Sequence, residues 1–112
     1  MSVVVKTLIS SKYASDSLNT EYTVPSGKKA IVDKFTATNT DASARTISIH
    51  LVPNGGAASA ANLITSALSI PAGESVDLPE VKNHVLESGD FVSAIASVAS
   101  KVVIRASGRE VT

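Results

Sequence analysis

The residues best suited to acid–base or metal chemistry in this chain are its two histidines, His50 and His84. No His-Glu-x-x-His pair, no Gly-x-Ser-x-Gly nucleophile elbow and no cysteine accompanies them, so a zinc site, a serine triad and a thiolate nucleophile all lack their sequence signatures. His50 falls in the polar row of an alternating segment, and His84 falls in a segment typical of a loop. We interpret both as surface or loop residues without a catalytic role.

Carboxylate residues lie close together at two places, Asp77 with Glu80 and Glu87 with Asp90. Each pair lies in or beside a turn, where acidic side chains are ordinarily solvated, and neither belongs to a dense Asp-x-Asp-x-Asp loop of the kind that binds Ca²⁺. The glycine-rich stretch at residues 54–56 has no Lys-Ser/Thr partner and opens no clear helix, so it does not indicate a phosphate cradle. We therefore expect no catalytic residue, no metal site and no cofactor, and we expect the chain not to be an enzyme.

Charge is balanced along the chain, with ten basic and ten acidic residues among 112 and no like-charged run longer than Lys28-Lys29. A protein that binds nucleic acid needs clustered Lys or Arg to displace counterions, so we expect no nucleic-acid partner. No stretch approaches the roughly 20 apolar residues of a membrane span, and the N-terminus lacks the features of a signal peptide. We expect a protein that is made in the cytoplasm and does not enter a membrane.

Alternation of apolar and polar residues is the main structural signal, and it predicts strands. It is clearest at residues 46–51, which predict a strand with one solvated face. Residues 18–24 and 102–107 repeat this pattern, whereas residues 28–40 are rich in β-branched and aromatic types. Residues 91–99 are apolar on both faces, as expected of a central strand.

Turn signals separate these segments. Pro25-Ser26-Gly27 and Pro71-Ala72-Gly73 each predict a tight type I turn whose glycine is free to take positive φ, and residues 87–90 form a third break. Residues 57–68 predict a long loop with one helical turn that leads into a strand near residues 63–70. About eight short strands predict an all-β fold, with one β-sandwich domain of antiparallel strands over residues 1–112 and a jelly-roll or related Greek-key topology.

The N-terminal segment, residues 1–9, has two interpretations that the sequence leaves open. A row of valines resists helix, so the segment is either an edge strand of its own domain or an arm that adds a strand to a neighbour's sheet. Its apolar residues are the candidate protein-interface residues: Val3, Val4, Val5, Leu8 and Ile9.

Aromatic residues are scarce, at 4% of the chain, and this weakens the case for a carbohydrate site. Sugar-binding sandwiches usually present exposed aromatic platforms, but Tyr22, Phe35 and Phe91 fall in predicted strands and are expected in the core. Tyr13 is then the one plausible platform. A glycan-binding module for host attachment stays an alternative, with Tyr13 and the loop at residues 54–62 as its contact surface.

The turn motifs also follow one another in a distinctive order. The stretch Tyr22-Thr23-Val24-Pro25-Ser26-Gly27-Lys28-Lys29-Ala30-Ile31-Val32 is followed by Asn39-Thr40, by the strand at residues 46–52 with Pro53, and by Pro71-Ala72-Gly73-Glu74. This order resembles a group of small tailed-bacteriophage virion proteins, in which a Tyr-Thr-Val-Pro-x-Gly-Lys turn opens a strand ending in Asn-Thr and a later Pro-Ala-Gly-Glu turn opens another. The similarity covers about residues 18–108.

The resemblance implies a β-sandwich component of a virion and transfers no catalytic residue. Our leading hypothesis is a non-enzymatic capsid decoration or cement protein that stabilises the phage head by protein–protein contacts. A neck, tail or baseplate component is the alternative within the same class. The implied partners are the major capsid protein or other virion proteins, together with further copies of the chain in a homo-oligomer, and the implied location is the virion after assembly in the host cytoplasm.

Overall fold

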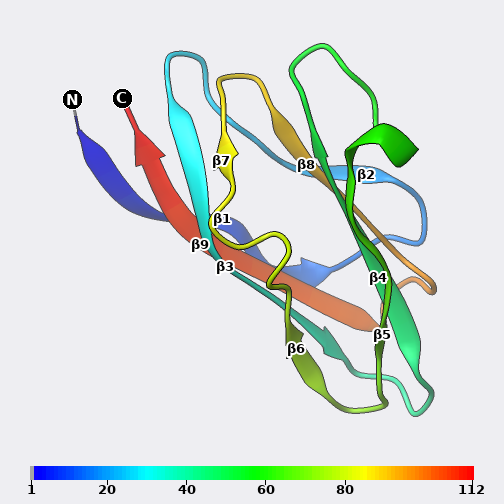
Figure 1. Cartoon of the computed structure of the whole chain (residues 1–112). Coiled ribbons are helices and arrows are strands. Elements are labelled where there is room, and N and C mark those ends of the chain that lie inside the picture. The colour runs from blue at the N-terminus through cyan, green and yellow to red at the C-terminus, as the bar shows by residue number, and fades with distance from the viewer. Residues whose placement is uncertain (1) are drawn as a thin grey trace.

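The structure, a computed structural model, describes residues 2–112 and confirms the all-β prediction. Its strands form two antiparallel sheets that face each other as a sandwich (Figure 1). The first sheet contains β1 (Val3–Tyr13), β9 (Val102–Val111), β3 (Lys29–Asn39), β6 (Ser75–Asp77) and β7 (Val85–Leu86). The second sheet contains β2 (Asn19–Thr23), β8 (Phe91–Ala96), β4 (Arg45–Val52) and β5 (Leu63–Ile70).

The order of the strands is that of a jelly roll. The first strand pairs with the last, β2 pairs with β8, and β4 pairs with β5, as in one long hairpin that has been rolled up. Of the three remaining strands, β6 and β7 both pair with β3 and share one position in the first sheet, with residues 78–84 between them. This split explains why the described residues contain nine strands where the sequence predicted about eight.

The core lies between the sheets and is built from small and branched side chains. Alternate residues of β3 and β9 face alternate residues of β4 and β8, and Phe35 is the largest side chain among those completely buried. The prediction that residues 91–99 form a central strand is confirmed for β8, which lies between β2 and β4, although the strand ends at Ala96. Burial of this apolar area supplies most of the free energy that stabilises the fold.

The two Pro-x-Gly turns form where the sequence predicted them, but with a different geometry. Lys28 N–H donates to the Pro25 carbonyl, and Glu74 N–H donates to the Pro71 carbonyl. In each turn the third residue is a glycine with positive φ, 78° at Gly27 and 74° in the later turn. A positive φ at this position belongs to a type II turn, so the type I prediction was wrong.

The Asn-Thr motif at the end of β3 has a structural role. Asn39 is completely buried, and its side-chain amide donates to the carbonyl groups of Ser43 and Ile70 at 2.8 and 2.9 Å. Its side-chain oxygen accepts from the N–H of Asp41, while the Thr40 hydroxyl donates to the Lys101 carbonyl at 2.7 Å. The motif therefore links three segments at one end of the sandwich: the loop after β3, the end of β5 and the loop before β9.

The loop before β5 contains the predicted helical turn, a 3₁₀ turn at Ala60–Asn62, and it covers His50. His50 is buried, so the prediction that it lies on a solvated face was wrong. Its Nδ1 lies 3.0 Å from both the Ser59 carbonyl oxygen and the Asn62 side-chain oxygen. Because both partners are acceptors, Nδ1 carries the proton and donates to them, and the histidine anchors the loop.

At Gly108 the strands β9 and β3 approach too closely to leave room for a side chain. A Cβ atom built on this residue would lie 2.0 Å from the Ile31 carbonyl oxygen and 2.9 Å from the Leu8 side chain. The irregularity in the β3–β9 register at Val32/Lys34 lies beside this contact. Only glycine fits here, because any side chain would push β9 away from β3.

We expect Gly108→Ala to lower the free energy of unfolding by about 1–3 kcal/mol, because the new methyl group overpacks the β3–β9 interface. Denaturant unfolding monitored by circular dichroism measures this loss. The neighbouring Ser107→Ala substitution removes a half-buried hydroxyl without adding volume and serves as the control. Equal stability of the two variants would contradict the proposed close contact.

Candidate assembly edge

The structure places the five candidate interface residues in two groups. Val3, Val4 and Val5 are exposed, at 51%, 48% and 82% of their surface. In contrast, Leu8 and Ile9 are buried in the core, where they cannot contact a neighbouring chain without unfolding. The candidate interface is therefore reduced to the three valines, and their strand, β1, pairs with β9 of its own sheet.

The free side of β1 is regular over its first half and irregular afterwards. Its register with β9 runs without interruption from Val3 to Thr7, and shifts occur between Thr7 and Ile9 and again between Ile9 and Lys12. Such bulges twist an edge away from further pairing, whereas an unbroken run leaves it open to another strand. We call residues 3–7 the β1 edge.

Backbone groups of alternate residues point outward from the β1 edge. The N–H of Thr112 donates to the carbonyl of Ser2, which places Ser2 among the residues that bond to β9. Hydrogen-bonded and non-hydrogen-bonded residues alternate along an antiparallel pair. Val3, Val5 and Thr7 therefore direct their N–H and C=O groups away from β9, toward a strand that could be added.

The other sheet edges are less suited to strand addition. On the second sheet, β2 has five residues and a register shift, and β5 has two register shifts and a residue at φ 44°, Ala67. The far side of the first sheet consists of β6 and β7, with three and two residues. Among residues 2–112, the β1 edge is therefore the longest regular apolar edge that is free to pair.

A buried carboxylate, that of Glu110, holds the β1 edge in place from behind. Glu110 is 2% exposed, and its oxygens lie 2.5 Å from the Tyr22 hydroxyl, 3.3 Å from Lys6 Nζ and 3.6 Å from Lys28 Nζ. Tyr22 belongs to the second sheet, whereas Glu110 and Lys6 belong to the first. The cluster thus connects the two sheets and pairs the ammonium group of Lys6, whose side chain is 46% exposed, with the buried carboxylate.

These contacts shift the ionisation of both acidic groups in the cluster. The hydrogen bond from Tyr22 is the largest influence and lowers the pKa of Glu110; burial opposes it, and the ammonium groups of Lys6 and Lys28 lower the pKa further. Burial, the hydrogen bond and the negative charge of Glu110 all raise the pKa of Tyr22 well above its ordinary value. The proton therefore stays on the tyrosine, and Glu110 is a carboxylate at neutral pH.

A second lysine of β1 holds a second glutamate in the same manner. Lys12 Nζ lies 2.5 Å from the carboxylate of Glu21, whose side chain is completely buried. Asn19 donates to the other oxygen of Glu21 at 3.2 Å. Because Glu21 belongs to β2 in the second sheet, this pair is another link between the sheets along β1.

The alternation in the sequence already indicates that Glu110 is buried, although it was not among the predicted site residues. The apolar row Val102, Ile104 and Ala106 continues in steps of two through Gly108 to Glu110, which places a carboxylate on the buried face. For β2 alternation gives the wrong face before Tyr22, because the register shift between Thr20 and Tyr22 interrupts the period of two. Leu18, which the alternation of residues 18–24 places on the apolar face, is 49% exposed, whereas Tyr22 packs against the core while half-buried, with its hydroxyl on Glu110.

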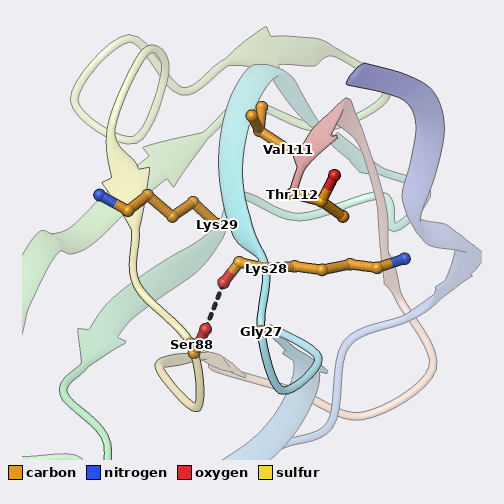
Figure 2. A pocket seen from close by; sticks show the side chains of 6 residues that line it. All are labelled: Gly27, Lys28, Lys29, Ser88, Val111 and Thr112. Carbon is orange, nitrogen blue, oxygen red and sulfur yellow. Dashed lines mark hydrogen bonds between the residues drawn. The ribbon is translucent and has the colours of Figure 1, made fainter. Parts of the chain in front are cut away.

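A pocket of about 410 Å³ lies beside this cluster, but its polar groups are already engaged. It is lined by Gly27, Lys28, Lys29, Ser88, Val111 and Thr112. Figure 2 shows the two lysine side chains extending in opposite directions and the Ser88 hydroxyl donating to the Lys28 carbonyl. Lys28 lies near Glu110, and Lys29 lies 3.3 Å from Glu87. The pocket therefore does not present a free cationic centre for an anionic ligand.

The remaining candidate residues have structural roles or lie in solvent. His84, Asp77 and Glu80 are exposed. The carboxylate of Asp90 accepts from the N–H groups of Asn54 and Glu87, both at 2.9 Å, and so ties two loops together. Within the described part of the chain, no cluster of His, Asp and Glu is arranged to hold a metal ion. Nor does any helix there have the length and apolar character needed to cross a membrane.

Comparison with known proteins shows similarity of fold and not of sequence. No protein-family model matches the chain, and no curated protein matches its sequence significantly. A solved structure described as Bacillus endospore appendages, a family of disulfide-linked pili, superposes with a TM-score of 0.61 at 12% identity and covers 98% of this chain and 88% of its own. A chain from infectious bursal disease virus, strain Gx, superposes with a TM-score of 0.51 at 13% identity; the match covers 97% of this chain and 30% of the viral one.

We expect Tyr22→Phe to lower the free energy of unfolding by about 1–3 kcal/mol near neutral pH, because the Glu110 carboxylate loses its shortest hydrogen bond. Chemical denaturation at a series of pH values measures this change. Tyr13→Phe, which alters an exposed tyrosine, is the matched control and should have no measurable effect.

The same measurements test the sign of the pH dependence. The pKa of Glu110 is lower in the folded than in the unfolded chain, so its contribution is complete above the unfolded pKa, about 4.3, and is lost as pH falls through the folded value. We expect Tyr22→Phe to reduce this acid-dependent loss, because the pKa of Glu110 then lies closer to its unfolded value. An acid limb identical to that of the unmodified chain would contradict the assignment.

Proposed function

We propose that the chain is a non-enzymatic structural subunit of a tailed-bacteriophage virion, and that it decorates the head and cements the major capsid protein by protein–protein contacts. The observation that carries the proposal is the β1 edge, a regular apolar strand whose outward backbone groups are positioned to pair with another chain. Strand addition of this kind gives affinity through main-chain hydrogen bonds and specificity through the side chains of alternate residues.

The β1 edge lacks the features that normally protect a sheet edge. Natural edges are protected by proline, by bulges or by charged side chains, above all lysine. Residues 3–7 contain no proline and no bulge, and the side chain of the one lysine among them, Lys6, is directed to the buried Glu110. An edge left in this state suits a protein that ends up covered by a neighbour.

The comparisons support a structural role in general and do not specify a phage particle. The two similar folds come from a pilus and from a virus, and both are assemblies of many protein copies. This sequence contains no cysteine, so the disulfide links of the pilus have no counterpart in it, and the proposal rests on strand pairing and apolar contacts. The turn motifs that resemble small phage virion proteins direct the proposal to a phage particle and to its head, with the neck, tail and baseplate as alternative positions.

The decisive experiment is the copy number of the chain in purified particles, measured by quantitative mass spectrometry against the major capsid protein. A decoration protein is present in hundreds of copies, whereas a neck, tail or baseplate component is present in a few or about a dozen. Absence from purified particles would overturn the proposal altogether.

We expect Val3→Asp to reduce the number of copies in particles at least about tenfold, because strand addition would have to bury a carboxylate without a partner. Quantification in particles assembled with the variant checks this result. Val85→Asp changes a valine of similar exposure, 55% against 51%, on the opposite side of the same sheet and should leave the copy number unchanged. Equal incorporation of both variants would remove the β1 edge from the proposal.

A further inference from the structure

We infer that the strand added to the β1 edge is the β1 edge of a second copy of the chain, in antiparallel orientation about a twofold axis that passes between the two Val5 residues. This inference rests on the proposed structural function and names the partner of the β1 edge. The result is a symmetric dimer in which two jelly rolls share one continuous sheet.

In this dimer β1 pairs with β1 of the second copy because the other sheet edges are poorly suited to accept it. A second copy offers β2, β5, β6 and β7 as alternatives, and each of them is short or has an irregular register. Two identical edges that pair with each other form an isologous contact, which closes after two copies. Pairing of β1 with a different edge would be heterologous and would require one of the irregular strands to accept it.

The register of the pairing follows from the length of the regular run. The uninterrupted register covers residues 3–7, and its midpoint is Val5. With the axis at Val5, this residue lies opposite Val5 of the partner subunit, and Val3 lies opposite the partner's Thr7. Val3, Val5 and Thr7 all direct backbone groups outward, so three residue pairs exchange two hydrogen bonds each, about six in total.

The charged side chains nearest the axis each have an acidic partner in their own chain. By alternation, Val3 and Val5 lie on the outer face of the sheet with Arg109, which is the residue opposite Val5 in β9. Arg109 donates to both carboxylate oxygens of Asp33, at 2.8 and 3.0 Å, so this face is neutral at the axis. On the inner face Lys6 is paired with Glu110, which also lies 3.6 Å from Lys28, so the one charged side chain of residues 3–7 has an acidic partner.

The residue at the twofold axis, Val5, is the most exposed apolar residue of the β1 edge, so dimer formation would bury the largest apolar area there. Val5 is 82% exposed, and pairing across the axis packs it against its own counterpart. Apolar β-branched side chains directly opposite each other stabilise antiparallel pairs. A contact limited to about five residues per copy is small, so the isolated dimer is expected to be weak and to strengthen where copies are held close together on a larger assembly.

A charge-swap experiment at the axis tests the inference directly. Val5→Lys places two ammonium groups opposite each other, and Val5→Glu places two carboxylates opposite each other, so each variant alone should associate at least about tenfold more weakly than the unmodified chain. Mixing the two variants in equal amounts pairs lysine with glutamate and should restore association to within about threefold of the unmodified chain. Sedimentation velocity up to about 1 mM chain measures all three, and Val85→Lys with Val85→Glu provide matched controls that should not change association.

A crosslinking experiment gives an independent measurement should the charged variants fold poorly. The chain contains no cysteine, so Val5→Cys introduces a single thiol. Residues in a hydrogen-bonded antiparallel pair lie about 5.5 Å apart at Cα, within the range of a disulfide. Under mild oxidation Val5→Cys should form dimers at least about tenfold faster than Val85→Cys.

Three results would overturn the inference: a monomeric unmodified chain at about 1 mM, no restoration when the charged variants are mixed, or equal crosslinking of the two cysteine variants. These failures are distinct from failure of the proposed function. A chain that stays monomeric but needs Val3 to enter particles is a structural subunit whose edge binds another protein. A chain that dimerises through Val5 but is absent from particles self-associates without the proposed virion role.

Discussion

Glu110 imposes a constraint that the rest of this structure has to satisfy. A carboxylate that is 2% exposed loses its hydration, and it is stable only where hydrogen bonds and opposite charges replace water. The structure meets this requirement with groups from three separate segments: Tyr22 from the second sheet, Lys6 from β1 and Lys28 from the turn before β3. The two sheets and the first strand are therefore fixed relative to one another, and the conformation of the β1 edge depends on a charge buried behind it.

The jelly-roll order explains why this cluster forms at all. Pairing of the first strand with the last brings residues 6 and 110 together, although almost the whole chain lies between them. Most contacts of such a fold join residues far apart in sequence, so they form late and only when both ends of the chain are present. The same order places β1 at the border of its sheet and leaves one side of it without a partner strand in its own chain.

Sequence reasoning reached the fold class and the position of most strands, because alternation and turn residues are local signals. It failed where a single inserted residue changes which face of a strand the neighbouring side chains lie on. The register shift beside Tyr22 reverses the faces of the residues that precede it, and alternation cannot reveal such an insertion before the partner strand is known. Burial of His50 depends on a loop that folds back over β4, and burial of Leu8 and Ile9 depends on the bulge that separates them from the exposed valines. The valines themselves could be identified from the sequence, whereas the cluster that pairs Lys6 with Glu110 could be recognised only after β1 was paired with β9.

The neighbouring positions of the two chain ends determine how this protein responds to mechanical force. Ser2 and Thr112 lie side by side at one corner of the molecule, and the strands that begin and end there are antiparallel neighbours (Figure 1). The hydrogen bonds between such strands run perpendicular to them, so tension applied to the two ends breaks these bonds one after another, as in a zipper, instead of shearing all of them at once. Tension that enters through the faces of the sandwich would avoid this weak direction. A tensile load on this protein is therefore carried better through contacts on the faces of the sandwich than through the ends of the chain.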